Sequence, residues 1–192
     1  MSFFTLNVPD TISLTDDQLF ELCSSNKESK IERDKHGNII IMSPAGGQSS
    51  IINAAITAVF FNWNQQTKQG VVFDSSGGFI LKDGSMRSAD VSWVSNERWK
   101  GLSEDQKEKF PPLAPDFIIE IRSRTDQIQT LQDKMKHWMD NGVSLGWLVD
   151  PVDKKVWIYS RGKVESTIDS FKCKISASKV VTGFELDLEN LL

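Results

Sequence analysis

The sequence is poor in cysteine and histidine and has no excess of positive charge. Its 192 residues include two cysteines, Cys23 and Cys173, and two histidines. Two distant cysteines without companions at ligand spacing cannot build a zinc site, so we expect reduced thiols. Lys and Arg number 22 against 26 Asp and Glu, a formal net charge of −4. This excludes a globally basic nucleic-acid coat, although not a local basic strip.

Long apolar runs and targeting signals are also missing. No stretch approaches the ~18 apolar residues of a membrane-spanning helix, and the start at Met1 lacks the basic region of a signal peptide. No repeat or flexible linker divides the chain, and 39% of its residues are hydrophobic. We therefore expect a cytoplasmic protein with one domain over residues 1–192, in which residues 1–13 form an N-terminal extension.

Two common catalytic motifs, a histidine paired with a nucleophile and a phosphate-binding loop, are absent as well. His36 falls in a predicted turn and His137 on a predicted helix, and neither has a serine or cysteine nucleophile nearby in the sequence. The glycine pairs at 46–47 and 77–78 lack the Lys-Ser/Thr that completes a phosphate-binding loop. These absences argue against a histidine-dependent hydrolase and against a P-loop enzyme.

The hydrophobic pattern predicts short strands interleaved with three main helices. The helices are expected to start at Thr15, to run from about Ile51 towards Gly70, and to span 126–141 with Asp126 as the N-cap. Strands are expected at 31–33, 39–42, 71–73, 79–81, 90–94, 116–121, 145–149 and 155–159. This order is typical of an α/β fold with a mixed sheet flanked by helices.

One strand carries an acidic residue where an apolar one is expected. Side chains alternate along 116–123, so Ile118, Glu120 and Arg122 share one face while the other face is apolar. Both faces are largely covered, and an unpaired carboxylate there would cost several kcal/mol. Glu120 must therefore be protonated, paired or bound to a cation. A buried ion pair with Arg122 is the structural alternative to a functional role.

Two further residues extend this observation. Asp90 begins an apolar strand, and its structural alternative is a turn or capping role. Lys134 adjoins the apolar stripe of the 126–141 helix, where a lysine side chain often extends to solvent instead. Two carboxylates hold a hard cation such as Mg²⁺ or Mn²⁺ through oxygen, and a nearby amine positions or deprotonates a water. Together, Asp90, Glu120 and Lys134 form a minimal set for phosphodiester hydrolysis.

Several segments in a fixed order resemble the Uma-two-like restriction endonuclease family, a branch of the PD-(D/E)XK nuclease superfamily. The resemblance covers about residues 14–192. It rests on the segments Ile31–Arg33, Ile41–Pro44, Gly70–Ser76, Arg87–Val94, Pro115–Ser123, Asp133–Met135, Asn141–Gly142 and Gly146–Pro151.

The resemblance implies a restriction-endonuclease-like sheet and a metal-dependent nuclease centre. It matches Asp90 and Glu120 to the acidic metal ligands and Lys134 to the lysine, here supplied by the following helix. Arg122 stands where the standard motif has lysine and is expected to hold a phosphate, because arginine cannot act as a base. Glu32 matches a further acidic position, as a ligand or an orienting group.

Two positions depart from the family pattern. Ala89 replaces the proline that usually precedes the aspartate, and Gln48 stands where relatives often carry an acidic residue or histidine. The first change removes no ligand, whereas the second leaves position 48 without the acidic or histidine side chain that relatives carry there.

These observations favour a Mg²⁺-dependent DNA endonuclease that acts on phosphodiester bonds. The partners expected are DNA and a second copy of the chain in a homodimer, and no membrane. Basic side chains that would line the DNA path are Lys82, Arg87, Arg122, Arg124 and Lys136. Two alternatives stay open: a catalytically inactive module of the same fold that binds nucleic acid or a protein partner, and a hydrolase that is not a nuclease.

Overall fold

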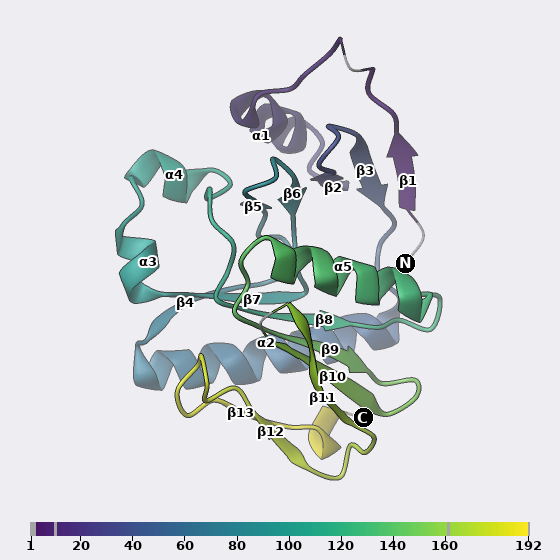
Figure 1. Ribbon diagram of the computed structural model, residues 1–192, viewed down its shortest axis with the longest axis vertical. Helices are drawn as coiled ribbons and strands as arrows, with labels where there is room; N and C mark the ends of the chain where they lie inside the picture. The colour runs from purple at the N-terminus through teal and green to yellow at the C-terminus, as the bar shows by residue number, and fades with distance from the viewer. Residues whose placement is uncertain (1–2, 10, 161, 192) are drawn as a thin grey trace.

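The computed structural model describes residues 3–9, 11–160 and 162–191, and its helices fall largely where the sequence predicts them (Figure 1). Residues 1, 2 and 10 of the expected N-terminal extension lie outside the described residues. The helices are α1 (Asp16–Ser25), α2 (Gly47–Thr67), α3 (Asn96–Lys100), α4 (Glu104–Glu108) and α5 (Ile128–Asp140), followed by the 3-10 turn η1 (Glu189–Leu191).

A six-stranded mixed sheet forms the centre of the molecule. Its order is β11-β10-β9-β8-β7-β4, and only β8 and β9 run parallel among its described strand pairs. The connection between these two strands contains α5, as a parallel pair requires. The strands are β4 (Gly70–Phe73), β7 (Val91–Ser95), β8 (Phe117–Ile121), β9 (Leu145–Asp150), β10 (Lys155–Ser160) and β11 (Lys163–Ile168).

A smaller antiparallel sheet packs with α1 at one end of the molecule (Figure 1). Its order is β1-β3-β2-β6-β5, so the N-terminal segment pairs with β3. The strands are β1 (Phe3–Leu6), β2 (Lys30–Arg33), β3 (Ile39–Met42), β5 (Phe79–Ile80) and β6 (Met86–Arg87); β12 (Lys174–Ser176) and β13 (Glu185–Asp187) pair separately near the C-terminus.

Helices α2 and α5 cover opposite faces of the central sheet (Figure 1). Phe117, Ile119 and Ile121 belong to the core beneath α2, whereas Ile118 belongs to the core beneath α5. The prediction that β8 is covered on both sides is therefore confirmed. Lys134 lies on the face of α5 that meets the sheet, where its ammonium donates a hydrogen bond to Glu120 of β8.

Two details of the helices differ from the sequence prediction. Asp126 does not cap α5: the N-cap is Gln127, and the Asp126 carboxylate instead accepts a hydrogen bond from the Ser123 backbone N–H at 2.8 Å. The apolar residues of α2 do not form one buried face, because Ile52, Ile56 and Phe60 are buried while Ile51 is 64% exposed. The helix is therefore apolar on two sides, and only one of them is used by the core.

The predicted cap of α1 and the hairpin between β9 and β10 are confirmed. The Thr15 side chain accepts a hydrogen bond from the Gln18 N–H, and the Gln18 side chain accepts one from the Thr15 N–H. Strand β10 pairs antiparallel with β9 over their full length. No helix among the described residues has the length and apolar character needed to cross a bilayer.

Candidate active site

The site forms where the chain passes from the small sheet to the central sheet. Strand β6 ends at Arg87 and β7 begins at Val91, so the segment 88–90 joins the two sheets. The β7–β8 register pairs Ser92 with Ile118. Continued by one step on the same face, this antiparallel register brings Asp90 opposite Glu120. The two carboxylates therefore come from neighbouring strands.

Asp90 is held by the backbone of β8. Its Oδ2 accepts a hydrogen bond from the Ile121 N–H at 2.7 Å. The Asp90 carbonyl accepts a longer hydrogen bond, 3.4 Å, from the Asn53 side chain on α2. Asp90 also lines the cleft described below.

Glu120 is buried and bound by two side chains of α5. It is 2% exposed, and its Oε1 accepts a hydrogen bond from Trp138 Nε1 at 2.9 Å. Lys134 Nζ lies 2.8 Å from Oε1 and donates to Oε2 at 3.0 Å. Lys134 and Trp138 are four residues apart on the helix, so both reach the same carboxylate.

Lys134 joins the carboxylates of both sheets. Besides contacting Glu120, its ammonium donates to the Ser88 carbonyl at 3.0 Å and lies 3.8 Å from Glu32 Oε1. Glu32, which is 2% exposed, also accepts hydrogen bonds from Arg87 at 2.8 Å and from the Ser88 N–H at 3.0 Å. A single amine is thus surrounded by groups from β2, β8 and the 88–90 segment.

The burial of these groups shifts their pKa values in different directions. Burial raises the pKa of Glu120, and the charge of Asp90 adds to this rise, while Lys134 opposes it. Burial by itself would lower the pKa of Lys134, but the charges of Glu120, Glu32 and Asp90 outweigh it and raise that pKa. Burial likewise opposes ionisation of Glu32, yet Lys134 and Arg87 lower its pKa overall. Lys134 is therefore a persistent cation.

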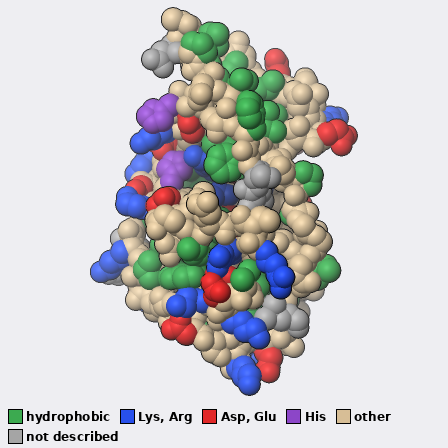
Figure 2. Space-filling model, turned by 90° about the vertical axis from the view of Figure 1, so that its right-hand side faces the viewer, with side chains coloured by type: hydrophobic (Ala, Val, Ile, Leu, Met, Phe, Trp, Pro, Cys, Tyr) green, Lys and Arg blue, Asp and Glu red, His purple; other side chains and the backbone are tan. Residues whose placement is uncertain are grey.

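Two hollows meet at this site. A cleft of about 770 Å³ is lined by Glu32, Arg87, Asp90, Glu120 and Lys134, together with both histidines of the chain. The histidines appear on the face shown in Figure 2, among Lys and Arg side chains. A second hollow of about 1110 Å³ follows α2 and also reaches Asp90. Asp90 is therefore accessible from both sides.

Arg122 does not pair with Glu120, the carboxylate two residues away that the sequence offered as its partner. Its guanidinium binds Asp150 at 2.6 Å and Asp153 at 2.7 Å. Within the described ranges, no hydrogen bond or ion pair joins Arg122 to Glu120, so the partner of Glu120 is Lys134 rather than Arg122. The catalytic roles expected for Glu32, Asp90, Glu120, Lys134 and Arg122 stay predictions.

Sequence reasoning missed two supporting side chains. Trp138 was expected only as part of an apolar stripe, and Arg87 only as part of a DNA path, whereas they bind Glu120 and Glu32. The four-residue spacing between Lys134 and Trp138 could have predicted that Trp138 contacts the same carboxylate as Lys134. Of the other basic residues expected along a DNA path, Lys136 lines the cleft and Arg124 lines the second hollow.

The acidic pair suits a hard divalent cation. Among residues 3–9, 11–160 and 162–191, no three His, Cys, Asp or Glu side chains are grouped as a ready metal site. Mg²⁺ needs no such group, because it keeps several waters and is commonly bound by one or two carboxylates plus a substrate phosphate. Asp90 and Glu120 supply two carboxylates close enough for one charge to raise the pKa of the other. These residues therefore fit the ion.

Comparisons with known proteins give one family match and a structural match to the fold. The model of the Uma2 family, described as "Putative restriction endonuclease", matches residues 16–189. A solved structure from Anabaena variabilis, described as "a putative nuclease belonging to DUF820", superposes with a TM-score of 0.75 at 20% identity. The match covers 93% of this chain and 97% of that one. A comparison with curated proteins found no match.

Proposed function

Because the chain belongs to the Uma2 family, whose description is "Putative restriction endonuclease", we propose that it is a Mg²⁺-dependent endonuclease that hydrolyses phosphodiester bonds in DNA. The observation that carries the proposal is the meeting of Asp90, Glu120 and Lys134 at one cleft. Mn²⁺ is expected to replace Mg²⁺, since both prefer oxygen ligands.

Each residue has a distinct role in this proposal. Asp90 and Glu120 would hold the cation, which when bound polarises the scissile phosphate and lowers the pKa of a bound water. Lys134 keeps its proton, so it orients the attacking water and offsets negative charge on the phosphate rather than acting as a base. Glu32, whose Oε1 lies 3.8 Å from the Lys134 ammonium, helps to hold it in place.

The charge of the cleft explains why the cation matters for binding as well. Seven Asp and Glu side chains line the cleft against five Lys and Arg side chains. An acidic cleft repels a polyanion, so DNA is expected to bind well only when a divalent cation offsets the carboxylates.

Cleavage of supercoiled plasmid and of single-stranded DNA in Mg²⁺ or Mn²⁺ tests the proposal. We expect wild type to cleave and Glu120→Gln to lose about a hundredfold or more of that activity, because the carboxylate charge is removed while its shape remains. The matched control is Glu185→Gln, an exposed position on β13, which should cleave like wild type.

A binding measurement separates the alternatives. Mg²⁺ should raise the melting temperature of wild type but not of Asp90→Asn, because a ligand stabilises the state that binds it. Cleavage that survives Glu120→Gln would overturn the proposed site. Salt-sensitive DNA binding without any cleavage by wild type would instead favour the inactive nucleic-acid-binding module.

A further inference from the structure

The two hollows at the candidate active site form one continuous groove. The residues that line both of them are Lys30, Met42, Asp90, Ile121, Thr125 and Asp126. From Asp90, one arm of the groove continues beside α5 and the other continues along α2. We call the whole the Asp90 groove, with an α5 arm of about 770 Å³ and an α2 arm of about 1110 Å³. A chain molecule can therefore extend in both directions from the candidate metal ligands.

The α2 arm has a lining of two kinds. Helix α2 contains no Asp, Glu, Lys or Arg, and along about two of its turns the exposed residues Ala54, Ala58 and Phe61 line this arm. The loop between β8 and α5 lines the same arm with Arg124 and Thr125, which offer a guanidinium and a hydroxyl. The faces of nucleic-acid bases are apolar and their phosphates are anionic. Such a lining therefore fits a strand whose bases lie against α2 and whose phosphates lie against the loop.

Half of the basic side chains in the groove have no acidic partner. Arg87, Lys134 and Lys136 line the groove and form ion pairs. The other basic residues of the lining form no ion pair within the part of the chain that the structure describes; they are Lys30, Lys35 and Arg124. These three cations are therefore available to bind phosphate oxygens.

Each arm of the groove also has an exposed phenylalanine. Phe3 lines only the α5 arm and is 56% exposed, whereas Phe61 lines only the α2 arm and is 49% exposed. Their elements, β1 and α2, lie on opposite sides of the central sheet (Figure 1). An exposed aromatic ring can stack on the face of an unpaired base. The bases of a duplex are stacked on one another and present only their edges in the grooves, so they offer no face to these rings.

We propose that the Asp90 groove binds a single strand of DNA. The position of the scissile phosphate at Asp90 rests on the proposed nuclease function. Phe3 and Phe61 stack on bases on the two sides of that phosphate. Lys30 and Arg124 bind neighbouring phosphates, and the apolar stripe of α2 contacts the bases between them.

The supply of unpaired cations also favours a single strand over a duplex. Proteins that bind duplex DNA tightly neutralise about six to ten phosphates. Lys30, Lys35 and Arg124, together with one divalent ion, would leave most of that charge without a partner. Stacking on the two phenylalanines adds affinity that does not depend on charge, and only unpaired bases can use it.

Fluorescence anisotropy of a labelled single strand and of the matching duplex tests the proposal without depending on cleavage. The measurement is made in Ca²⁺, which takes oxygen ligands as Mg²⁺ does. We expect the single strand to bind at least about tenfold more tightly than the duplex, because only its bases can stack on the two rings. The logarithm of the binding constant should fall with the logarithm of the salt concentration with a slope of about −2, as expected for a single strand with three neutralised phosphates.

Matched alanine variants test the two rings. Phe3→Ala and Phe61→Ala should each weaken single-strand binding about fivefold or more, because each removes one stacking platform. The control for the first is Phe4→Ala, a neighbour on β1 that is 63% exposed and lines neither arm. The control for the second is Val59→Ala, which is 43% exposed on α2 and also lines neither arm. Both controls should bind like wild type, and circular dichroism checks that all four variants fold.

The outcomes separate this inference from the proposed nuclease function. Duplex binding as tight as single-strand binding, or single-strand binding that Phe3→Ala and Phe61→Ala leave unchanged, would overturn the single-strand groove even if wild type cleaves plasmid. Single-strand binding that depends on both rings, without cleavage in Mg²⁺ or Mn²⁺, would support the groove and overturn the nuclease function. A wild type that binds no single strand would overturn the groove and leave its apolar stripe to a different partner.

Discussion

Replacing Lys134 by methionine should reveal how strongly the site depends on one buried cation. Methionine keeps much of the length of the side chain but removes its charge. Among the described residues, Trp138 is then the one side chain that still donates a hydrogen bond to Glu120. Removing one partner of a buried ion pair typically costs about 3–5 kcal/mol. Because the Lys134 side chain is 20% exposed, we expect the free energy of unfolding to fall by about 3 kcal/mol, the lower end of that range.

Urea denaturation followed by tryptophan fluorescence, at pH 7.5 in EDTA, measures this loss. With an m-value of about 2 kcal/mol/M, a loss of about 3 kcal/mol lowers the midpoint by roughly 1.5 M. The double variant Lys134→Met with Glu120→Gln should be more stable than Lys134→Met alone, because the buried charge of Glu120, left without its partner, is removed as well.

The matched control is Lys136→Met on the same helix. Lys136 pairs with Asp140, but their side chains are 66% and 51% exposed, so this change should cost less than about 0.5 kcal/mol. If Lys134→Met and Lys136→Met destabilise the protein equally, the reasoning about the buried cation is wrong.

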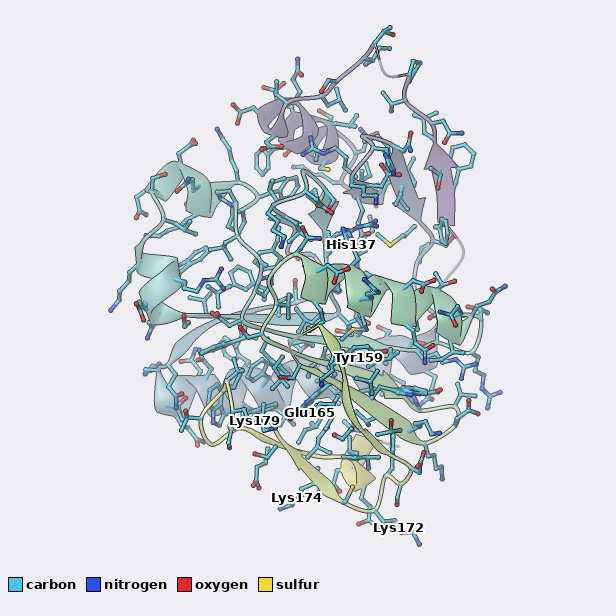
Figure 3. The ribbon with its side chains drawn as sticks, in the orientation of Figure 1. His137, Tyr159, Glu165, Lys172, Lys174 and Lys179 are labelled. Atoms are coloured by element: carbon cyan, nitrogen blue, oxygen red, sulfur yellow. The ribbon has the colours of Figure 1, made fainter. Side chains whose placement is uncertain are left out.

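Two further predictions concern the fold. Burial raises the pKa of Tyr159, the one tyrosine of the sequence, to about 12; its side chain lies beneath α5, on the other side from His137 (Figure 3). Absorbance at 295 nm should report ionisation of the Tyr159 hydroxyl near pH 12 in the folded protein and near pH 10 in urea. The free energy of unfolding should therefore fall as pH rises from 10 towards 12. A titration midpoint near 10 in the folded protein would contradict this. Gly70→Ala should cost about 2 kcal/mol or more of the free energy of unfolding, since its Cβ would lie 2.3 Å from the Val94 carbonyl oxygen. Gly47→Ala, inside α2 with nothing within 4 Å of the added Cβ, should not destabilise the protein in the same thermal unfolding measurement.

Much of the local structure follows from short-range patterns. The α1 cap depends on Thr15 and Gln18, three residues apart, and the strand alternation around Glu120 depends on a period of two. Such features can be predicted because the groups that decide them are close in the sequence. The family segments likewise predicted the nuclease-like fold.

Tertiary structure decided which groups meet. Arg122 is two residues from Glu120, yet it binds Asp150 and Asp153, because β9 lies beside β8 and ends next to it. Glu32 reaches Lys134 only because the small sheet packs against the central one, a contact between segments about a hundred residues apart. Residue types and periodicity thus determined the candidate groups, whereas long-range packing determined their partners, since no local pattern encodes which distant strand becomes a neighbour.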